Sequence, residues 1–241
     1  MDYSTYTHKL YHDIFLNNCV KLKQMLINIR RFIRLISLTI FPRRCIGCQI
    51  KDFWICEKCL DKIPMSCERK ISFAFSIFEY RNHIIRKAIW MLKFNKRYSV
   101  LQDLEEKINI GFNNFLKAQN LEGKNIILIP IPITKRSRVT RGYNQSELIC
   151  KIITKNRKNL TFENKILLKS KNHLAQNKIK NKVERINNVR NSFEVKNEEK
   201  IKREIVVLID DVTTTGATLD QARKSLNKAG VKKVFAFTLA H

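Results

Sequence analysis

The chain has 241 residues, 44% of them hydrophobic, so it is long enough to bury a core and is expected to fold. Its net charge of +26 favours polyanionic partners such as nucleic acid or phosphorylated metabolites. A genome rich in Lys, Asn and Ile codons would explain the same surplus, because the charge is spread along the chain. No apolar run approaches the roughly 18 residues that a membrane span needs, and no signal peptide is apparent. We therefore predict a cytoplasmic protein.

The first half of the chain is predicted to contain three parts. Residues 1–42 have apolar side chains at three- and four-residue steps beside several arginines, which predicts a basic amphipathic helix ended by Pro42. Residues 43–70 contain clustered cysteines. Residues 71–124 are predicted to form a strand or hairpin at 71–80 and helices at about 84–94 and 99–117, as a connecting region.

The second half, residues 125–241, alternates between strand and helix patterns. Strands are predicted at 126–131, 205–209 and 234–239, with another somewhere in 160–168, and helices at 145–154 and 218–228. The polar segment 169–191 is predicted to be a mobile loop or a short exposed helix. This alternation indicates an α/β domain with a parallel sheet flanked by helices.

Four cysteines form two C-x2-C pairs, namely Cys45 with Cys48 and Cys56 with Cys59. Four thiolates at this spacing can close a tetrahedral zinc site, with Zn–S distances of about 2.3 Å, and such a closed site is structural. A thioredoxin-like redox pair and an iron–sulfur cluster are the alternatives, of which we favour neither. Cys67 is a possible spare ligand, although single cysteines are more often buried apolar residues.

The segment 205–218 has the features of a phosphate cradle beside a pair of acids. A fully apolar strand leads to Asp210 and Asp211, which are expected at the surface of a cleft, and a loop of small hydroxyl residues then leads into a helix. The backbone N–H groups of such a loop, the helix N-terminus and Gly216 suit a phosphate. The adjacent carboxylates suit two sugar hydroxyls or a hydrated Mg²⁺. We therefore predict a ribose 5-phosphate site.

A basic stretch follows the first strand of the second half. We expect it to be a loop at the same edge of the sheet and to supply pyrophosphate ligands, because arginine forks pair with phosphate oxygens. A basic loop on its own is more often merely solvated. The four candidate residues are Lys135, Arg136, Arg138 and Arg141.

Residues 205–218 resemble the phosphoribosyl-pyrophosphate (PRPP) motif of type I phosphoribosyltransferases. That resemblance implies that Asp210 and Asp211 bind the ribose hydroxyls or magnesium. It also implies that the 5-phosphate is held by Thr213, Thr214, Thr215, Gly216, Ala217 and Thr218. Pro130-Ile-Pro132 followed by Arg141-Gly-Tyr-Asn-Gln145 resembles the ComF family, the competence-associated branch of this superfamily. Leu92-Lys-Phe94 and the cysteine module are similar to that family as well.

The resemblance implies a PRPP-binding protein linked to competence and DNA uptake, with structural zinc and with Mg²⁺ accompanying PRPP. One hypothesis is an enzyme that transfers the phosphoribosyl group to an acceptor that the sequence does not identify. The alternative is a non-catalytic sensor of PRPP or nucleotide, or an accessory protein that binds single-stranded DNA and works with DNA-uptake proteins. We read Trp54 and Trp90 as packing residues rather than as base-stacking platforms.

Overall fold

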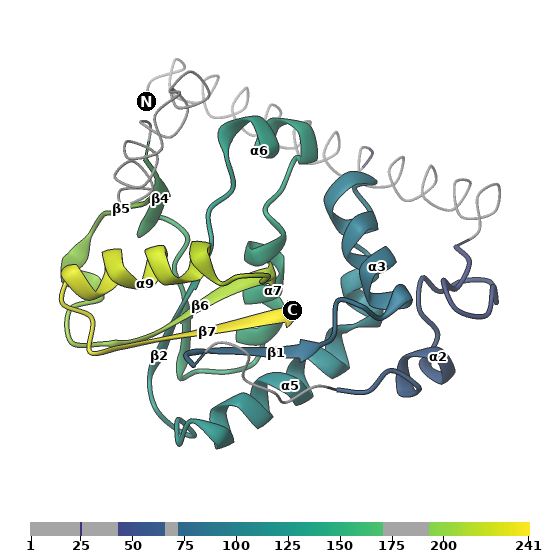
Figure 1. Ribbon diagram of the computed structural model, residues 1–241, viewed down its shortest axis with the longest axis horizontal. Helices are drawn as coiled ribbons and strands as arrows, with labels where there is room; N and C mark the ends of the chain where they lie inside the picture. Colours follow the sequence, from purple (N-terminus) through teal and green to yellow (C-terminus); the bar gives the residue numbers. More distant parts are fainter. Residues whose placement is uncertain (1–24, 26–42, 66–71, 171–192) are drawn as a thin grey trace, which may run out of the picture. The chain divides into compact units, whose positions relative to one another are not determined.

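The computed structural model describes residue 25 and residues 43–65, 72–170 and 193–241 (Figure 1). The chain divides into two compact units, residues 1–45 with 49–53 and residues 46–48 with 54–241. In the smaller unit, Arg44 and Lys51 form an isolated antiparallel bridge. The predicted N-terminal helix lies outside the described residues except for Met25, which is helical. The larger unit carries the sheet.

A five-stranded parallel sheet with the order β1-β7-β6-β2-β3 forms the centre of the larger unit. Its strands are β1 (Ala74–Phe78), β2 (Ile126–Pro130), β3 (Leu160–Phe162), β6 (Ile205–Val212) and β7 (Lys233–Ala240). In the central pair, Ile209 lies opposite Phe237 and Asp210 lies opposite Thr238. Because the strands are parallel, all their carboxyl ends meet at one edge, where ligands bind in open sheets of this kind.

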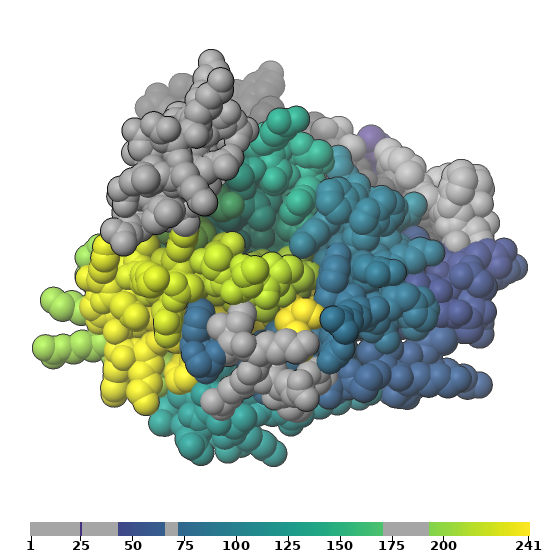
Figure 2. Space-filling view, in the orientation of Figure 1, coloured from purple at the N-terminus to yellow at the C-terminus, as the bar shows by residue number. Residues whose placement is uncertain are grey.

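Helices surround this sheet, and a small antiparallel ribbon lies apart from it. The helices are α2 (Glu57–Asp61), α3 (His83–Phe94), α4 (Val100–Asp103), α5 (Glu105–Ala118), α6 (Lys135–Arg141), α7 (Gln145–Thr154) and α9 (Ala217–Lys228), with the 3-10 turn η3 (Glu198–Lys200). The ribbon pairs β4 (Leu167–Lys169) with β5 (Phe193–Val195). Figure 1 shows α9 in front of the sheet and α7 behind it. Figure 2 shows that α9 and α3 both reach the surface on that face.

Alternate side chains of β6 belong to two separate apolar clusters. Val206 and Leu208 pack in one cluster with residues of α9, such as Leu226. Val207 and Ile209 pack in the other cluster with residues of α3, α5 and α7. Successive side chains of a strand point to opposite faces, so both faces of the sheet are covered. This arrangement confirms the predicted α/β fold with a parallel, helix-flanked sheet.

Several elements agree with the sequence patterns, and others differ from them. Helix α7 has the predicted bounds, and Gly230 follows α9 with φ 82°, as expected for a helix end. The predicted helix at 99–117 is two helices, because Leu104 interrupts it. The segment 160–168 contains β3 and most of β4, which belong to different sheets. Among the described residues, no helix has the length and apolar character needed to cross a membrane.

Two differences change the carboxyl edge of the sheet. The basic stretch after β2 is helix α6 rather than a loop, because Thr134 caps its N-terminus by accepting from the N–H of Ser137 at 3.1 Å. Gly142 ends this helix with φ 83°, a backbone conformation that is less favourable for residues with a side chain than for glycine. Strand β6 continues past Ile209 to Val212, so both acids lie within the strand and not after it.

Candidate functional site

The two acids of β6 have different partners at the carboxyl edge of the sheet. One oxygen of Asp211 lies 3.0 Å from the Nζ atom of Lys93, at the end of α3. The Oδ1 atom of Asp210 accepts from the hydroxyl of Ser146 at 3.1 Å and from the N–H of Asp211 at 2.9 Å. Ser146 lies in the first turn of α7. The two carboxyl groups are therefore contacted by side chains from two different helices.

Burial changes the chemistry of both carboxyl groups. Asp211 is only 5% exposed, and its Oδ2 atom is buried without any hydrogen-bond partner among the described residues. A buried carboxylate oxygen without a donor is destabilising, so a bound group that donates a hydrogen bond there would be favoured. Burial, followed by the charge of Asp211, raises the pKa of Asp210 to about 7. The expectation that both acids lie at the surface of the cleft is therefore wrong for Asp211.

The threonine-rich loop after β6 leads directly into α9. Thr213 is buried, and its N–H donates to the carbonyl of Ala240 at 3.0 Å. The next two threonines, Thr214 and Thr215, are exposed. Gly216 precedes the helix with φ 72° and has no side chain to cap it. The first N–H groups of a helix have no intrahelical partner, so this 12-residue helix presents donors that can bind an anion.

The four basic residues of α6 do not converge on one point. Arg138 forms a two-pronged ion pair with Glu147 of α7, with distances of 2.7 and 3.1 Å. The guanidinium of Arg141 lies over the ring of Phe94, 5.7 Å from its centre. Lys135 and Arg136 are exposed, and neither forms an ion pair within the described ranges. Only Lys135 and Arg138 line the pocket described next.

A pocket of about 460 Å³ lies between α6, α7 and the β4–β5 ribbon. Its lining combines apolar and charged side chains, including Ile133, Lys135, Arg138, Glu147, Leu168 and Lys169. Burial lowers the pKa of Lys169, and the nearby charge of Asp210 partly offsets this. Lys169 therefore connects the pocket electrostatically with the acids of β6. Residues 210–218, all of which the structure describes, do not line the pocket themselves.

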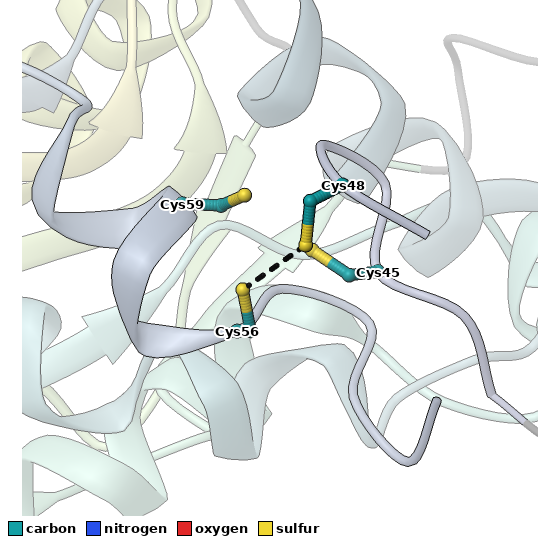
Figure 3. Close-up of side chains that lie close together, drawn as sticks. All are labelled: Cys45, Cys48, Cys56 and Cys59. Atoms are coloured by element: carbon teal, nitrogen blue, oxygen red, sulfur yellow. Dashed lines mark hydrogen bonds between the residues drawn. The ribbon is translucent and has the colours of Figure 1, made fainter. Parts of the chain in front are cut away.

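The four predicted metal ligands lie close together (Figure 3). All four sulfur atoms, those of Cys45, Cys48, Cys56 and Cys59, lie within 4.8 Å of one another. The sulfurs of Cys48 and Cys56 are 3.5 Å apart. A Cβ atom at Gly47 would be 2.7 Å from the sulfur of Cys59, so only glycine fits this turn. Four thiolates at these separations suit a tetrahedral ion such as zinc. Cys67 lies outside the described residues.

Comparison with known proteins shows which proteins the chain resembles. The family model described as a phosphoribosyl transferase domain matches residues 159–241. "Competence protein F" of Haemophilus influenzae is 28% identical over 209 residues, covering 81% of this chain and 89% of the relative. "Competence protein ComFC" of Streptococcus pneumoniae is 32% identical over 128 residues, covering 53% and 54%. The domain match and the curated relatives support a ComF-like protein with a phosphoribosyltransferase-like domain.

Two further comparisons give the extent of these likenesses. The "DNA utilization protein YhgH" of Escherichia coli K12 is 23% identical to this chain, and the match covers 76% of both chains. A solved hypoxanthine phosphoribosyltransferase of Staphylococcus aureus is 14% identical, with a TM-score of 0.36, over 57% of this chain and 62% of the other. The family-model match includes β6, the threonine-rich loop and α9, whereas Lys93 and the four cysteines lie outside it.

The partners of the two acids could not be identified from the sequence. In the sequence, Lys93 belongs to a tripeptide that is similar to one in the ComF family. Ser146 belongs to a predicted helix, and Lys169 begins a polar segment. Each lies far from β6 in the chain, and only the fold brings it to Asp210 or Asp211. The one available signal was a lysine at the end of an amphipathic helix, which is common on solvated surfaces.

Proposed function

We propose that this ComF-like protein binds PRPP, or a related phosphoribosyl ligand, at the carboxyl edge of its sheet. One observation carries the proposal. The buried Oδ2 atom of Asp211 has no donor among the described residues, and it lies on the strand that leads into the open N-terminus of α9. A sugar hydroxyl would supply the missing donor, and a phosphate on the same sugar would accept from the helix and loop N–H groups.

In this proposal each part of the ligand has its own protein partners. The 5-phosphate binds the residues that follow β6, namely Thr213, Thr214, Thr215, Gly216, Ala217 and Thr218. The ribose hydroxyls bind Asp210 and Asp211. The pyrophosphate extends toward Lys135 and Lys169, neither of which forms an ion pair within the described ranges. Arg136, Arg138 and Arg141 remain candidates, but Arg138 would have to leave Glu147 and Arg141 would have to leave Phe94.

The reaction that fits such a ligand is phosphoribosyl transfer. An acceptor nitrogen forms a bond to the ribose C1 atom while the bond from C1 to the pyrophosphate oxygen breaks. Mg²⁺ bound with PRPP would neutralise the leaving pyrophosphate. Lys135 and Lys169 would add fixed positive charge on the same side. The acceptor is not identified by the described residues, so turnover is a separate question from binding.

The names of the relatives support a cellular setting for this activity. One relative is named for competence and another for DNA utilization. We infer a cytoplasmic role connected with DNA uptake, with DNA-uptake proteins as partners.

Calorimetric titration with PRPP in the presence of Mg²⁺ tests the binding proposal. We expect saturable binding at one site per chain. No heat of binding over the concentration range typical of metabolites, up to about 1 mM, would contradict it. Measuring pyrophosphate release with a panel of nucleobases tests turnover. Binding of PRPP without release of pyrophosphate in the presence of any base would favour the non-catalytic sensor.

A second candidate function, binding of single-stranded DNA, is supported by one surface feature. Trp90, Phe94 and Tyr98 are 49%, 62% and 60% exposed, so Trp90 is not the packing residue that the sequence suggested. The ring centres of Trp90 and Phe94 lie 6.0 Å apart, and the guanidinium of Arg141 lies over the ring of Phe94. Exposed aromatic rings beside arginine suit stacking with unpaired bases.

Fluorescence titration with an unlabelled oligothymidylate over a salt series tests this candidate. We expect the affinity to fall as salt rises, and to fall further when Phe94 is replaced by alanine. An affinity indifferent to salt, or unaffected by the Phe94→Ala substitution, would argue against this surface.

A further inference from the structure

The ion pair between Lys93 and Asp211 places a fixed cation within the proposed ligand site. The two charged atoms are 3.0 Å apart, and the side chains are only 27% and 7% exposed. An ion pair shielded to this extent is screened by salt much less than a surface pair. The charge of Asp211 is therefore compensated before any ligand or metal ion arrives.

The end of α3 holds Lys93 in this place. The hydroxyl of Tyr143 donates to the carbonyl of Leu92 at 2.6 Å, which fixes the turn that carries Lys93. At the other end of the helix, the side chain of Asn82 accepts from the N–H groups of Ile84 and Ile85. A cation in the last turn of a helix also interacts favourably with the helix dipole.

The same geometry leaves little room for a metal ion bound directly by both acids. One oxygen of Asp211 faces the ammonium of Lys93, and one oxygen of Asp210 accepts two hydrogen bonds. Mg²⁺ demands near-octahedral oxygen ligation, and an ion shared by both acids would lie close to a positive charge. A sugar hydroxyl needs only one acceptor, and the Oδ2 atom of Asp211 provides it.

We propose that Lys93 is the resident counter-cation of the acid pair, so that the sugar-phosphate part of the ligand binds without a divalent metal ion. Mg²⁺ is then needed only for the pyrophosphate part. This inference rests on the proposed function, because it concerns the same ligand. Lys93 is a positioning residue: its ion pair holds Asp211 in the orientation that faces the sugar.

The test compares ribose 5-phosphate, which carries no pyrophosphate, with PRPP, each titrated into the full chain with EDTA or with Mg²⁺. For the natural protein we expect the affinity for ribose 5-phosphate to be the same in both conditions. In Lys93→Gln, which keeps a hydrogen-bond donor and removes the charge, we expect the metal-free affinity to fall at least about tenfold. Added Mg²⁺ should restore part of this loss, which a merely structural defect would not show.

Two variants complete the comparison. Lys93→Arg keeps the charge and should retain metal-independent binding. Lys87→Gln removes an exposed lysine from the same helix and should behave like the natural protein. Unchanged metal-free affinity in Lys93→Gln would overturn the proposal. So would a requirement for Mg²⁺ when ribose 5-phosphate binds to the natural protein or to Lys93→Arg, and these measurements decide the matter if Lys93→Gln does not fold.

These outcomes are distinct from a failure of the proposed function. If neither ribose 5-phosphate nor PRPP binds the natural protein in any condition, the ligand class itself is wrong. If both bind but only with Mg²⁺, the ligand class stands and the role of Lys93 is wrong.

Discussion

The cysteine cluster and the acid pair of β6 are built in opposite ways. The cluster takes four identical donor atoms from one short segment, Cys45 to Cys59, and their sulfur atoms converge on one point. The acid pair takes its partners from α3, α7 and the β4–β5 ribbon, which lie far apart in the chain. A local site depends mainly on the metal, whereas a site assembled from distant elements depends on the whole sheet.

Breaking the cysteine cluster should have the largest effect on stability. We expect Cys56→Ser to lose bound zinc and to lower the melting temperature strongly, because structural zinc contributes about 10–16 kcal/mol in small zinc-finger peptides. Metal analysis and thermal unfolding measure the two effects. Cys150→Ala, which replaces a buried cysteine outside the cluster, should keep the zinc. Iron instead of zinc, or full metal content in Cys56→Ser, would refute this assignment.

Substitution of the acids should have the largest effect on ligand binding. We expect Asp210→Asn with Asp211→Asn to lower PRPP affinity by about 100-fold or more, because truncating a buried charged partner costs about 2–5 kcal/mol. The fold should persist, but with reduced stability, because Lys93 loses its carboxylate. Circular dichroism monitors the fold and calorimetry monitors binding. Normal affinity in the folded double variant would show that the site is elsewhere.

A pair of glycine substitutions distinguishes the role of the loop in ligand binding from the effect of backbone strain on stability. Gly216 and Gly123 have φ values of 72° and 70°. Gly216→Ala and Gly123→Ala should each cost about 1–2 kcal/mol of unfolding free energy, because a Cβ atom disfavours this conformation. Only Gly216→Ala should also weaken phosphate binding, because Gly123 lies in an exposed turn before β2. Equal ligand affinity in both variants would remove the loop from the site.

The titration of Asp210 gives an effect that is spread over several pH units and concerns stability rather than binding. Its pKa is raised to about 7, so the folded protein holds a proton that the unfolded chain releases near pH 4. Stability should therefore fall as the pH rises from about 4 to about 7 and then level off. Asp210→Asn should remove this part of the pH dependence and raise the melting temperature at pH 8. Melting curves from pH 5 to pH 8 test this, and parallel curves for both proteins would contradict it.

Much of this fold could be predicted from residue patterns. The bounds of α7 and the positions of β2, β6 and β7 follow from apolar periodicity and from caps such as Asn144, which accepts from the N–H of Ser146. The extension of β6 through Asp210 and Asp211 was not predictable, because acids disfavour strands unless other contacts hold them. The helical form of residues 135–141 was also missed, since their charge outweighed the signals of Thr134 and Gly142.

The sequence by itself determined which chemical groups this protein has: four clustered thiolates, two adjacent acids and a threonine-rich turn before a helix. These signals are local, because spacing along the chain reflects backbone geometry directly. Only the tertiary structure decided that Lys93 neutralises Asp211, that Ser146 holds Asp210 and that Arg141 turns toward Phe94. Such partners come from separate elements, and the packing of helices on the two faces of the sheet selects them from many similar lysines, serines and arginines.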